Sequence, residues 1–283
     1  MDRIIVIGGN SGIGKSLAER VAKRGIQPYL IGRNAAALAE VAAANQGEFA
    51  VADVLDEEAL ASAVKNACEG ASITGLAYCV GSIDLKPLRQ LTGDSMVNAF
   101  RINAVGAAIA AREAAAALKD AKGAMVMFST IAVAQGFVSH TIVSAAKGAV
   151  EGLTRALAAD WAPHVRVNAI APSLTDTPLA AKLTANANMA EAIAGMHAIS
   201  RLGQAGDHAA LADFLLSAEA GWITGQIFAV DAERAPSGHL DLTLCSHPGT
   251  ATIHRKHLPR NPSCFSRQQK IRQRRMITRL PQT

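Results

Sequence analysis

Short apolar runs alternate with longer Ala- and Leu-rich segments along the first 230 residues. The short runs predict seven strands, at residues 3–8, 27–32, 48–52, 74–80, 123–129, 164–170 and 226–230. The longer segments predict seven helices, at residues 12–25, 34–45, 56–68, 92–119, 139–161, 178–197 and 207–218. Several strands are apolar at almost every position, which is typical of strands buried on both faces. The alternation predicts an α/β fold: a single, doubly wound domain around a seven-stranded parallel sheet.

The composition changes near residue 234. Residues 235–283 contain five prolines, nine Lys or Arg and one acidic residue, a net charge of +8, whereas residues 1–234 have a net charge of −3. No hydrophobic period is sustained after residue 234. We therefore predict a folded domain over 1–234 and a basic, disordered tail over 235–283. Two alternatives stay open for the tail: a site for anionic lipid or nucleic acid, and an out-of-frame coding segment.

Several classes of protein are disfavoured by what the sequence lacks. No apolar run approaches the length of about 18 residues that spans a bilayer. The first residues lead straight into a strand and do not resemble a signal peptide, so we expect a cytoplasmic protein that binds neither membranes nor nucleic acid. The four cysteines form no Cys-x-x-Cys pair, so we expect neither a metal site nor a disulfide framework.

The first predicted strand ends in a glycine-rich turn that leads into the first predicted helix. Its residues are Gly8, Gly9, Asn10, Ser11, Gly12, Ile13 and Gly14. Such a turn lets backbone N–H groups approach a phosphate at a helix N-terminus. Two motifs fit it. The run from Gly9 to Ser16 matches the phosphate loop G-x-x-x-x-G-K-[ST] of nucleoside triphosphatases, with Asp53 as the magnesium-holding residue. The glycine spacing G-x-x-x-G-x-G instead indicates a dinucleotide.

Later residues favour the dinucleotide. From residue 3 to about 231 the sequence resembles the short-chain dehydrogenase/reductase family, in particular its 3-oxoacyl-(acyl carrier protein) reductases. The matching segments follow in family order: the glycine turn, Asp53-Val54, Asn103-Ala-Val-Gly, Ser144-Ala-Ala-Lys147-Gly, 166–172, Thr177-Pro178, Arg201-Leu-Gly203 and 223–231. The resemblance implies a Rossmann fold that binds a nicotinamide cofactor. It places cofactor contacts at Gly8, Asn10, Ser11, Gly12, Ile13, Gly14, Asp53, Val54, Lys147, Pro172, Thr175 and Thr177.

The end of the second strand indicates which cofactor is bound. An acidic residue at this position binds the ribose hydroxyls of NAD, whereas a nearby Arg accommodates the 2′-phosphate of NADP. Here the strand ends in Gly32-Arg33-Asn34, without an acid. We therefore expect NADP(H) rather than NAD(H), with Arg33 and Asn34 beside the phosphate.

The family's active site is matched only in part. Its chemistry is a reversible hydride transfer in which a Tyr exchanges the proton, a Lys four residues later holds the ribose, a Ser orients the substrate oxygen and an Asn holds a relay water. Lys147 and Asn103 match the Lys and the Asn, and Thr130 stands at the Ser position. Val143 stands at the Tyr position and cannot exchange a proton.

A histidine is the candidate substitute. His140 and Lys147 are separated by seven residues, a spacing that puts both on one face of a helix. Histidine titrates near neutral pH and is the commonest general acid/base. An exposed His at a helix start is equally ordinary, and Thr141 and Ser144 are weaker candidates. The two tyrosines, Tyr29 and Tyr78, are both expected on strands.

These residues predict an NADP(H)-dependent oxidoreductase that acts on a small carbonyl or alcohol through an altered proton relay. The runner-up is an NADP(H)-binding sensor or oligomer partner with little or no catalysis, and a nucleoside triphosphatase is a remote third. The resemblance implies a homotetramer or homodimer. The segment from Pro178 to Arg201 is mostly apolar and is expected to cover the substrate.

Overall fold

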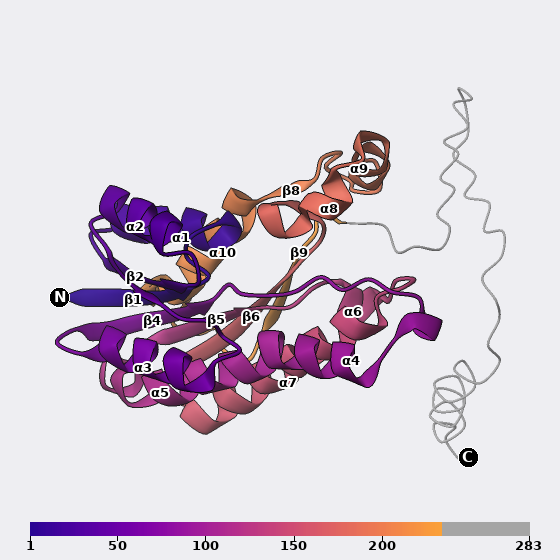
Figure 1. Ribbon diagram of the computed structural model, residues 1–283. Coiled ribbons are helices and arrows are strands. Elements are labelled where there is room, and N and C mark those ends of the chain that lie inside the picture. Colours follow the sequence, from indigo (N-terminus) through magenta and orange to yellow (C-terminus); the bar gives the residue numbers. More distant parts are fainter. Residues whose placement is uncertain (234–283) are drawn as a thin grey trace, which may run out of the picture. The chain divides into compact units, whose positions relative to one another are not determined.

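A seven-stranded parallel sheet runs through the part of the chain described by the computed structural model, residues 1–233 (Figure 1). The strands are β1 (Asp2–Ile7), β2 (Gln27–Gly32), β3 (Glu48–Val51), β4 (Ser72–Tyr78), β5 (Ala124–Phe128), β6 (Arg166–Pro172) and β9 (Ile227–Val230). Their order in the sheet is β3-β2-β1-β4-β5-β6-β9. All seven predicted strands are present, and the predicted doubly wound α/β fold is confirmed.

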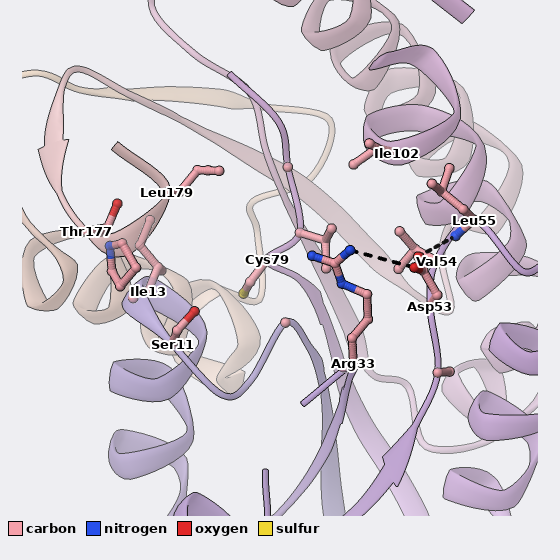
Figure 2. Close-up of a pocket in the computed structure, with 17 residues that line it drawn as sticks. Ser11, Ile13, Arg33, Asp53, Val54, Leu55, Cys79, Ile102, Thr177 and Leu179 are labelled. Carbon is pink, nitrogen blue, oxygen red and sulfur yellow. Dashed lines mark hydrogen bonds and ion pairs between the residues drawn. The ribbon is translucent and has the colours of Figure 1, made fainter. Parts of the chain in front are cut away.

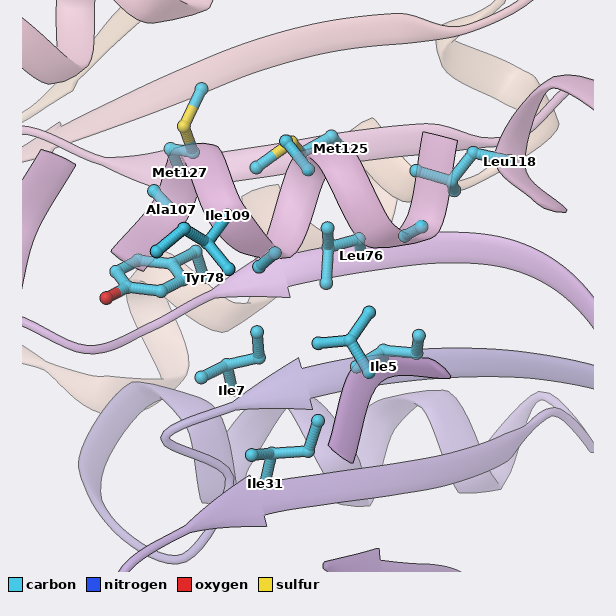
Figure 3. Close-up of a cluster of buried hydrophobic side chains, with 14 of the residues drawn as sticks. Ile5, Ile7, Ile31, Leu76, Tyr78, Ala107, Ile109, Leu118, Met125 and Met127 are labelled. Atoms are coloured by element: carbon cyan, nitrogen blue, oxygen red, sulfur yellow. The ribbon is translucent and has the colours of Figure 1, made fainter. Parts of the chain in front are cut away.

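Helices cover both faces of this sheet (Figure 1). One face is covered by α1 (Gly12–Lys23), α2 (Ala35–Ala44) and α10 (Ala205–Leu216). The other is covered by α3 (Glu57–Cys68), α5 (Gly106–Asp120) and α7 (Thr141–Trp161). Because both faces are covered, the central strands are apolar throughout: Ile4, Ile5, Val6 and Ile7 have no exposed surface. Figure 3 shows the cluster on the second face, where side chains of β1, β2 and β4 lie against α5.

The chain changes its direction of growth across the sheet after β3. Strands β2 and β3 are added on one side of β1, and β4 is added on the other. The carboxyl ends of β1 and β4 therefore stand side by side, with the Cys79 N–H bonded to the Ile7 carbonyl at 2.8 Å. Ligands of open α/β sheets bind in the crevice outside such a point.

Two predicted helices are interrupted. The segment 92–119 contains α4 (Gly93–Phe100), a π-helical turn (Arg101–Val105) and α5. The segment 178–197 contains a 3₁₀ turn (Pro178–Ala180), α8 (Ala181–Thr184) and α9 (Ala187–Ala194). The second break has a local cause, because the Asn186 side chain accepts the Met189 N–H and so begins a new helix. The single helix predicted over 178–197 was wrong, whereas the chain is helical from residue 93 to 120 and differs from the prediction by the π-helical turn within it.

Five short elements were not predicted from the sequence. They are α6 (Ala132–Gln135), the 3₁₀ turns Leu88–Gln90 and Ala218–Ala220, and the two-residue strands β7 (Thr175–Asp176) and β8 (Gly203–Gln204), which pair with each other in parallel. They are too short for a hydrophobic period to reveal them.

The predicted basic tail, 235–283, lies outside the described residues, so its boundary with the domain stays a prediction. Within residues 1–233 no helix is long and apolar enough to cross a membrane.

Arg166, the first residue of β6, connects the sheet to the end of α10. Its guanidinium donates to the carbonyls of Leu215, Ser217 and Ala220 at 2.8–3.0 Å. Carbonyls in the last turn of a helix have no partner within the helix, so Arg166 provides what α10 itself cannot.

Arg166→Leu is expected to lower the free energy of unfolding by about 3 kcal/mol, because it leaves three carbonyls without a charged donor. Arg155→Leu is the matched control, since Arg155 makes only an exposed pair with Glu151 at 3.4 Å and its loss should cost less than about 0.5 kcal/mol. Urea unfolding measures both. Equal losses would show that Arg166 does not hold α10.

Candidate active site and cofactor groove

A groove of about 240 Å³ runs along the carboxyl ends of β1, β2 and β4 (Figure 2). The glycine turn and the segment 177–179 form one wall, and residues 52–55 with Ile102 form the other. The cofactor residues predicted from the sequence that line it are Gly8, Ser11, Gly12, Ile13, Arg33, Asp53, Val54 and Thr177. The groove therefore brings together residues that are up to 169 positions apart in the chain.

The conformation of the glycine turn requires glycine at two of its positions. Gly8 has a φ of +84°, which L side chains rarely adopt, and a Cβ on Gly14 would overlap the Gly8 carbonyl oxygen. The Ser11 side chain makes no capping bond to α1, and the first turn of α1 holds no acidic residue. The helix N-terminus thus faces the groove with free N–H groups, an arrangement that suits a phosphate.

Arg33 and Asn34 stand where β2 ends. A second pocket beside the groove is lined by Asn10, Arg33 and Asn34 together with the first residues of α2. The Arg33 side chain is 77 % exposed, and its Nη1 lies 3.7 Å from the Asp53 carboxylate. At that distance the pair is loose, so the guanidinium keeps donors for a ligand. The Asn34 Oδ1 caps α2 by accepting the Ala37 N–H at 3.1 Å, which leaves only its amide NH₂ for a ligand.

Asp53 lies on the opposite wall of the groove (Figure 2). One carboxylate oxygen accepts the Leu55 N–H at 3.0 Å, which fixes the turn after β3. Val54 is 9 % exposed: it packs into the core and also lines this wall of the groove.

Lys147 is buried beside Gly81, a residue that lines the groove. Its Nζ donates to the Phe128 carbonyl at 2.8 Å, and burial lowers the pKa of its ammonium group to about 8. A Cβ at Gly81 would lie 3.0 Å from the Lys147 Nζ and 3.2 Å from the Asn103 Oδ1. Gly81 therefore brings the groove close to both polar groups, but the four predicted catalytic residues are not among those that line it: Thr130, Lys147, Asn103 and His140.

Asn103 lies in the π-helical turn and is 1 % exposed. Its Nδ2 donates to the Ser82 Oγ at 2.9 Å and to the Ala99 carbonyl at 2.8 Å, and its Oδ1 accepts the Ser82 N–H at 3.3 Å. Both amide protons are thus used within the chain, and the carbonyl oxygen keeps one lone pair for a further donor.

Val143 lies on α7 one turn before Lys147 and is 6 % exposed. Thr130 is half-buried after β5, and its Oγ1 accepts the Ala132 N–H at 3.3 Å. The neighbouring Ser129 hydroxyl donates to Glu151 on α7 at 2.9 Å, so its proton is already used within the chain. The Ser144 hydroxyl is committed as well, to the Ala132 carbonyl at 3.1 Å.

His140 is the N-cap of α7, which begins at Thr141. The argument from a shared helical face therefore does not apply to His140 itself. Its Nδ1 lies 2.8 Å from the Val138 carbonyl, so Nδ1 carries a proton and donates it there. The ring also meets the Phe137 ring edge-on at 5.2 Å. These contacts leave Nε2 as the nitrogen that can accept or deliver a proton.

Neither tyrosine can stand in for the missing one. Tyr29 is 7 % exposed and packs beneath the Arg3 guanidinium at 5.1 Å. Tyr78 is 2 % exposed, and its hydroxyl donates to the Ile102 carbonyl at 2.6 Å.

The segment after β6 is anchored by two buried histidines. The Thr175 hydroxyl donates to the Ser173 carbonyl at 2.9 Å and lies 2.7 Å from the His208 Nε2. The Ser173 hydroxyl lies 2.8 Å from the His197 Nε2. Thr175 is thus 7 % exposed with its hydroxyl in use, whereas Thr177 lines the groove. Pro172, the last residue of β6, accepts the Ile131 N–H through its carbonyl.

Sequence reasoning assigned no role to Cys79, Gly81 or Ser82. Cys79 and Gly81 line the groove, and Ser82 holds Asn103. The strand order could have identified these three residues, because the segment that follows β4 lies at the point where the strand order reverses and ligands bind. Burial raises the pKa of the Cys79 thiol to about 12, so Cys79 is not a nucleophile at neutral pH.

Comparison with known proteins agrees with this arrangement. The family described as enoyl-(acyl carrier protein) reductase matches residues 7–232. The chain belongs to the short-chain dehydrogenase/reductase family. It is 35 % identical over 235 residues to a galactitol 2-dehydrogenase (L-tagatose-forming) from Cereibacter sphaeroides, covering 80 % of this chain and 92 % of that protein.

Two further relatives bear on structure and activity. A short-chain type dehydrogenase/reductase from Mycobacterium ulcerans superposes with a TM-score of 0.77 at 27 % identity, over 82 % of this chain and 89 % of that one. A protein named inactive 2-(S)-hydroxypropyl-CoM dehydrogenase 2, from Xanthobacter autotrophicus, is 32 % identical over 76 % of this chain and 97 % of its own length.

Family membership decides between the two interpretations of the glycine turn. The short-chain dehydrogenases/reductases are oxidoreductases that bind nicotinamide cofactors, so the triphosphatase motif is coincidental. Lys15, its central residue, is exposed on α1 and is not among the residues that line the groove.

The buried His208 predicts a pH-dependent stability. Burial lowers its pKa from 6.5 to about 4, so between these values the unfolded chain binds more protons than the folded one and stability falls as the pH falls. From pH 8 to pH 5, wild type should lose about 2 kcal/mol more unfolding free energy than His208→Gln.

Urea unfolding at both pH values measures this difference. The control is His164→Gln, because His164 is exposed, and it should follow wild type. A His208→Gln variant with the same loss as wild type would contradict the buried neutral histidine.

Proposed function

We propose that the protein is an NADP(H)-dependent oxidoreductase that transfers hydride between the nicotinamide and a small carbonyl or alcohol through an altered proton relay. One observation carries this proposal: the groove beside the phosphate-binding turn is lined by Gly81, which lies against the buried Lys147 and Asn103. Val143 stands where the family has its proton donor. We further propose a cytoplasmic protein that works as a homodimer or homotetramer.

The residues along the groove fit the successive parts of NADP(H). The turn from Gly8 to Gly14 would hold the pyrophosphate, and Asp53 with Val54 would hold the adenine. Arg33 and the Asn34 amide would bind the 2′-phosphate, because their pocket holds a largely exposed cation and no acid from β2. Lys147 would hold the nicotinamide ribose. Of the residues after β6, Pro172 and Thr177 are better placed than Thr175, whose hydroxyl is already in use.

When bound, the cofactor supplies or accepts the hydride, and the chain must manage the oxygen and its proton. Thr130 would orient the substrate oxygen with its hydroxyl, which accepts the Ala132 N–H and would turn its proton from a long 3.5 Å bond to the Pro172 carbonyl toward the substrate. Asn103 would hold a relay water through the free lone pair of its Oδ1. Lys147, with one proton committed to Phe128, keeps two donors for the ribose.

His140 is the proposed proton donor, with solvent as the other source. Because its Nδ1–H is bonded to Val138, the proton would leave from Nε2 of the imidazolium during reduction and return to it during oxidation. A position at the N-cap of α7, in a half-exposed loop, allows the ring to exchange protons with water.

A second candidate is an NADP(H)-binding protein with little or no catalysis, a sensor or an oligomer partner. The buried, apolar Val143 favours it, because loss of a positioned acid typically costs about 10²–10⁴ in rate. One relative is named an inactive dehydrogenase, which is consistent with a family member that lacks turnover. Assaying NADPH oxidation with a panel of ketones and quinones separates the two candidates: turnover supports the first, and binding without turnover supports the second.

Arg33→Ala is expected to weaken NADPH binding by about 10- to 100-fold, because a hydrogen-bonded charge pair is lost. NADH binding should change less than about threefold. Fluorescence titration of the nicotinamide measures both. Arg20→Ala, an exposed arginine on α1, should bind both cofactors as wild type does. Equal losses for NADH and NADPH would refute the 2′-phosphate site.

His140→Gln is expected to lower kcat by about 10²-fold or more without changing the KM for NADPH, because an acid is lost and the cofactor groove is not touched. His164→Gln again serves as the control. Val143→Tyr is expected to raise kcat by restoring the family's donor above Lys147. If wild type turns over and His140→Gln does so equally fast, His140 is not the donor.

A further inference from the structure

Tyr78 is the last residue of β4, and its ring is buried among the apolar side chains between the sheet and α5 (Figure 3). Its hydroxyl is the one polar atom of that side chain, and it donates to the Ile102 carbonyl at 2.6 Å. Ile102 precedes Asn103 within the π-helical turn. The bond therefore joins the core of the sheet to the backbone of the turn that carries Asn103.

A π-helical turn is a costly local conformation. It inserts one extra residue into an otherwise α-helical path, occurs mostly as a single turn and is frequent at functional sites. Its carbonyls accept N–H groups five residues further along the chain, whereas those of an α-helix accept N–H groups four residues further along. In the π-helical turn the Gly106 N–H is donated to the Arg101 carbonyl, whereas in an α-helix it would be donated to Ile102. The Tyr78 hydroxyl supplies the Ile102 carbonyl with a donor in its place.

Gly106, the first residue of α5, makes the contact possible. A Cβ at Gly106 would overlap the Tyr78 hydroxyl and lie 3.3 Å from the ring carbon that bears it. The helix thus approaches Tyr78 as closely as a backbone without a side chain allows. The phenol fills this space completely, so its position is set by packing as well as by the hydrogen bond.

The same turn is held at two further points. Arg101 donates to the Leu55 carbonyl at 2.8 Å on the adenine side of the groove, and Asn103 exchanges hydrogen bonds with Ser82. Tyr78 supplies the third attachment, from the β4 strand of the sheet. Burial and the nearby Asp53 carboxylate raise the pKa of the phenol, so the hydroxyl stays a donor over the whole neutral and alkaline range.

We propose that Tyr78 is a positioning residue: its hydroxyl, seated against Gly106, holds the Ile102 carbonyl and thereby fixes the π-helical turn that presents Asn103 to the active site. This inference rests on the proposed function only for its effect on turnover. Its effect on the turn itself is independent of catalysis.

The test compares Tyr78→Phe with the matched control Tyr29→Phe, a buried tyrosine of β2 outside the site. Hydrogen exchange, followed by mass spectrometry on peptides that cover residues 99–108, should be accelerated at least tenfold in Tyr78→Phe and unchanged in Tyr29→Phe. Unchanged exchange in both variants would overturn the proposal. This result does not depend on any activity, so it stays informative if the proposed oxidoreductase function fails.

Turnover supplies the second measurement, with NADPH and the best ketone of the panel. Tyr78→Phe should lower kcat about tenfold and leave the KM for NADPH unchanged, since misplacement of a catalytic group affects the reaction more than binding. In the Asn103→Ala background, Tyr78→Phe should have no further effect on kcat. Effects of the two substitutions that multiply would show that Tyr78 acts elsewhere.

The close contact between Gly106 and the Tyr78 hydroxyl gives a third test of the proposal. Gly106→Ala should lower the thermal midpoint and accelerate exchange over residues 99–108, because its methyl group meets the Tyr78 hydroxyl. Combining it with Tyr78→Phe removes the atom that clashes, so the double variant should recover most of the thermal midpoint. A double variant that is less stable than either single one would contradict the close seating of the phenol.

Discussion

The arrangement of the site depends on a constraint of the sheet. Because β2 and β3 grow on one side of β1 and β4 grows on the other, the chain leaves β1 and β4 in opposite directions and opens a crevice between them. The glycine turn after β1 forms one wall, and the segment from Cys79 to Gly81 after β4 also lines the crevice. Glycine lets these segments lie close together, because a Cβ on Gly8 would stand 3.1 Å from the Val80 Cγ2 and a Cβ on Gly14 would overlap the Gly8 carbonyl oxygen.

Catalysis in this crevice needs buried polar groups that are held without a proton-transferring tyrosine. Lys147 is held by the Phe128 carbonyl, and Asn103 by Ser82 and Ala99. Burial lowers the pKa of Lys147, and the apolar Val143 lies one turn before it on α7. The site therefore combines a buried lysine and a buried asparagine with an apolar residue, Val143, on α7. His140 lies at the N-cap of the same helix.

The sequence predicted the sheet well because its signals are local. Ile4 to Ile7 are apolar at consecutive positions since both faces of β1 are covered, and the glycine turn follows at once. The interruption of helix 92–119 was not predictable in the same way. Residues 101–105 have ordinary helical composition, and the π-helical turn depends on Tyr78, Leu55 and Ser82, which are distant in sequence. Thr175 also looked available from its spacing, and only the fold shows that His208 and Ser173 occupy its hydroxyl.

The central claim is that the crevice is an NADP(H) site. Calorimetric titration of the full chain with NADPH, NADH and MgATP tests it most directly. The account predicts one NADPH bound per chain, at least tenfold weaker binding of NADH and no competition by MgATP. Binding of MgATP at the same site, or no binding of either nicotinamide cofactor, would contradict it.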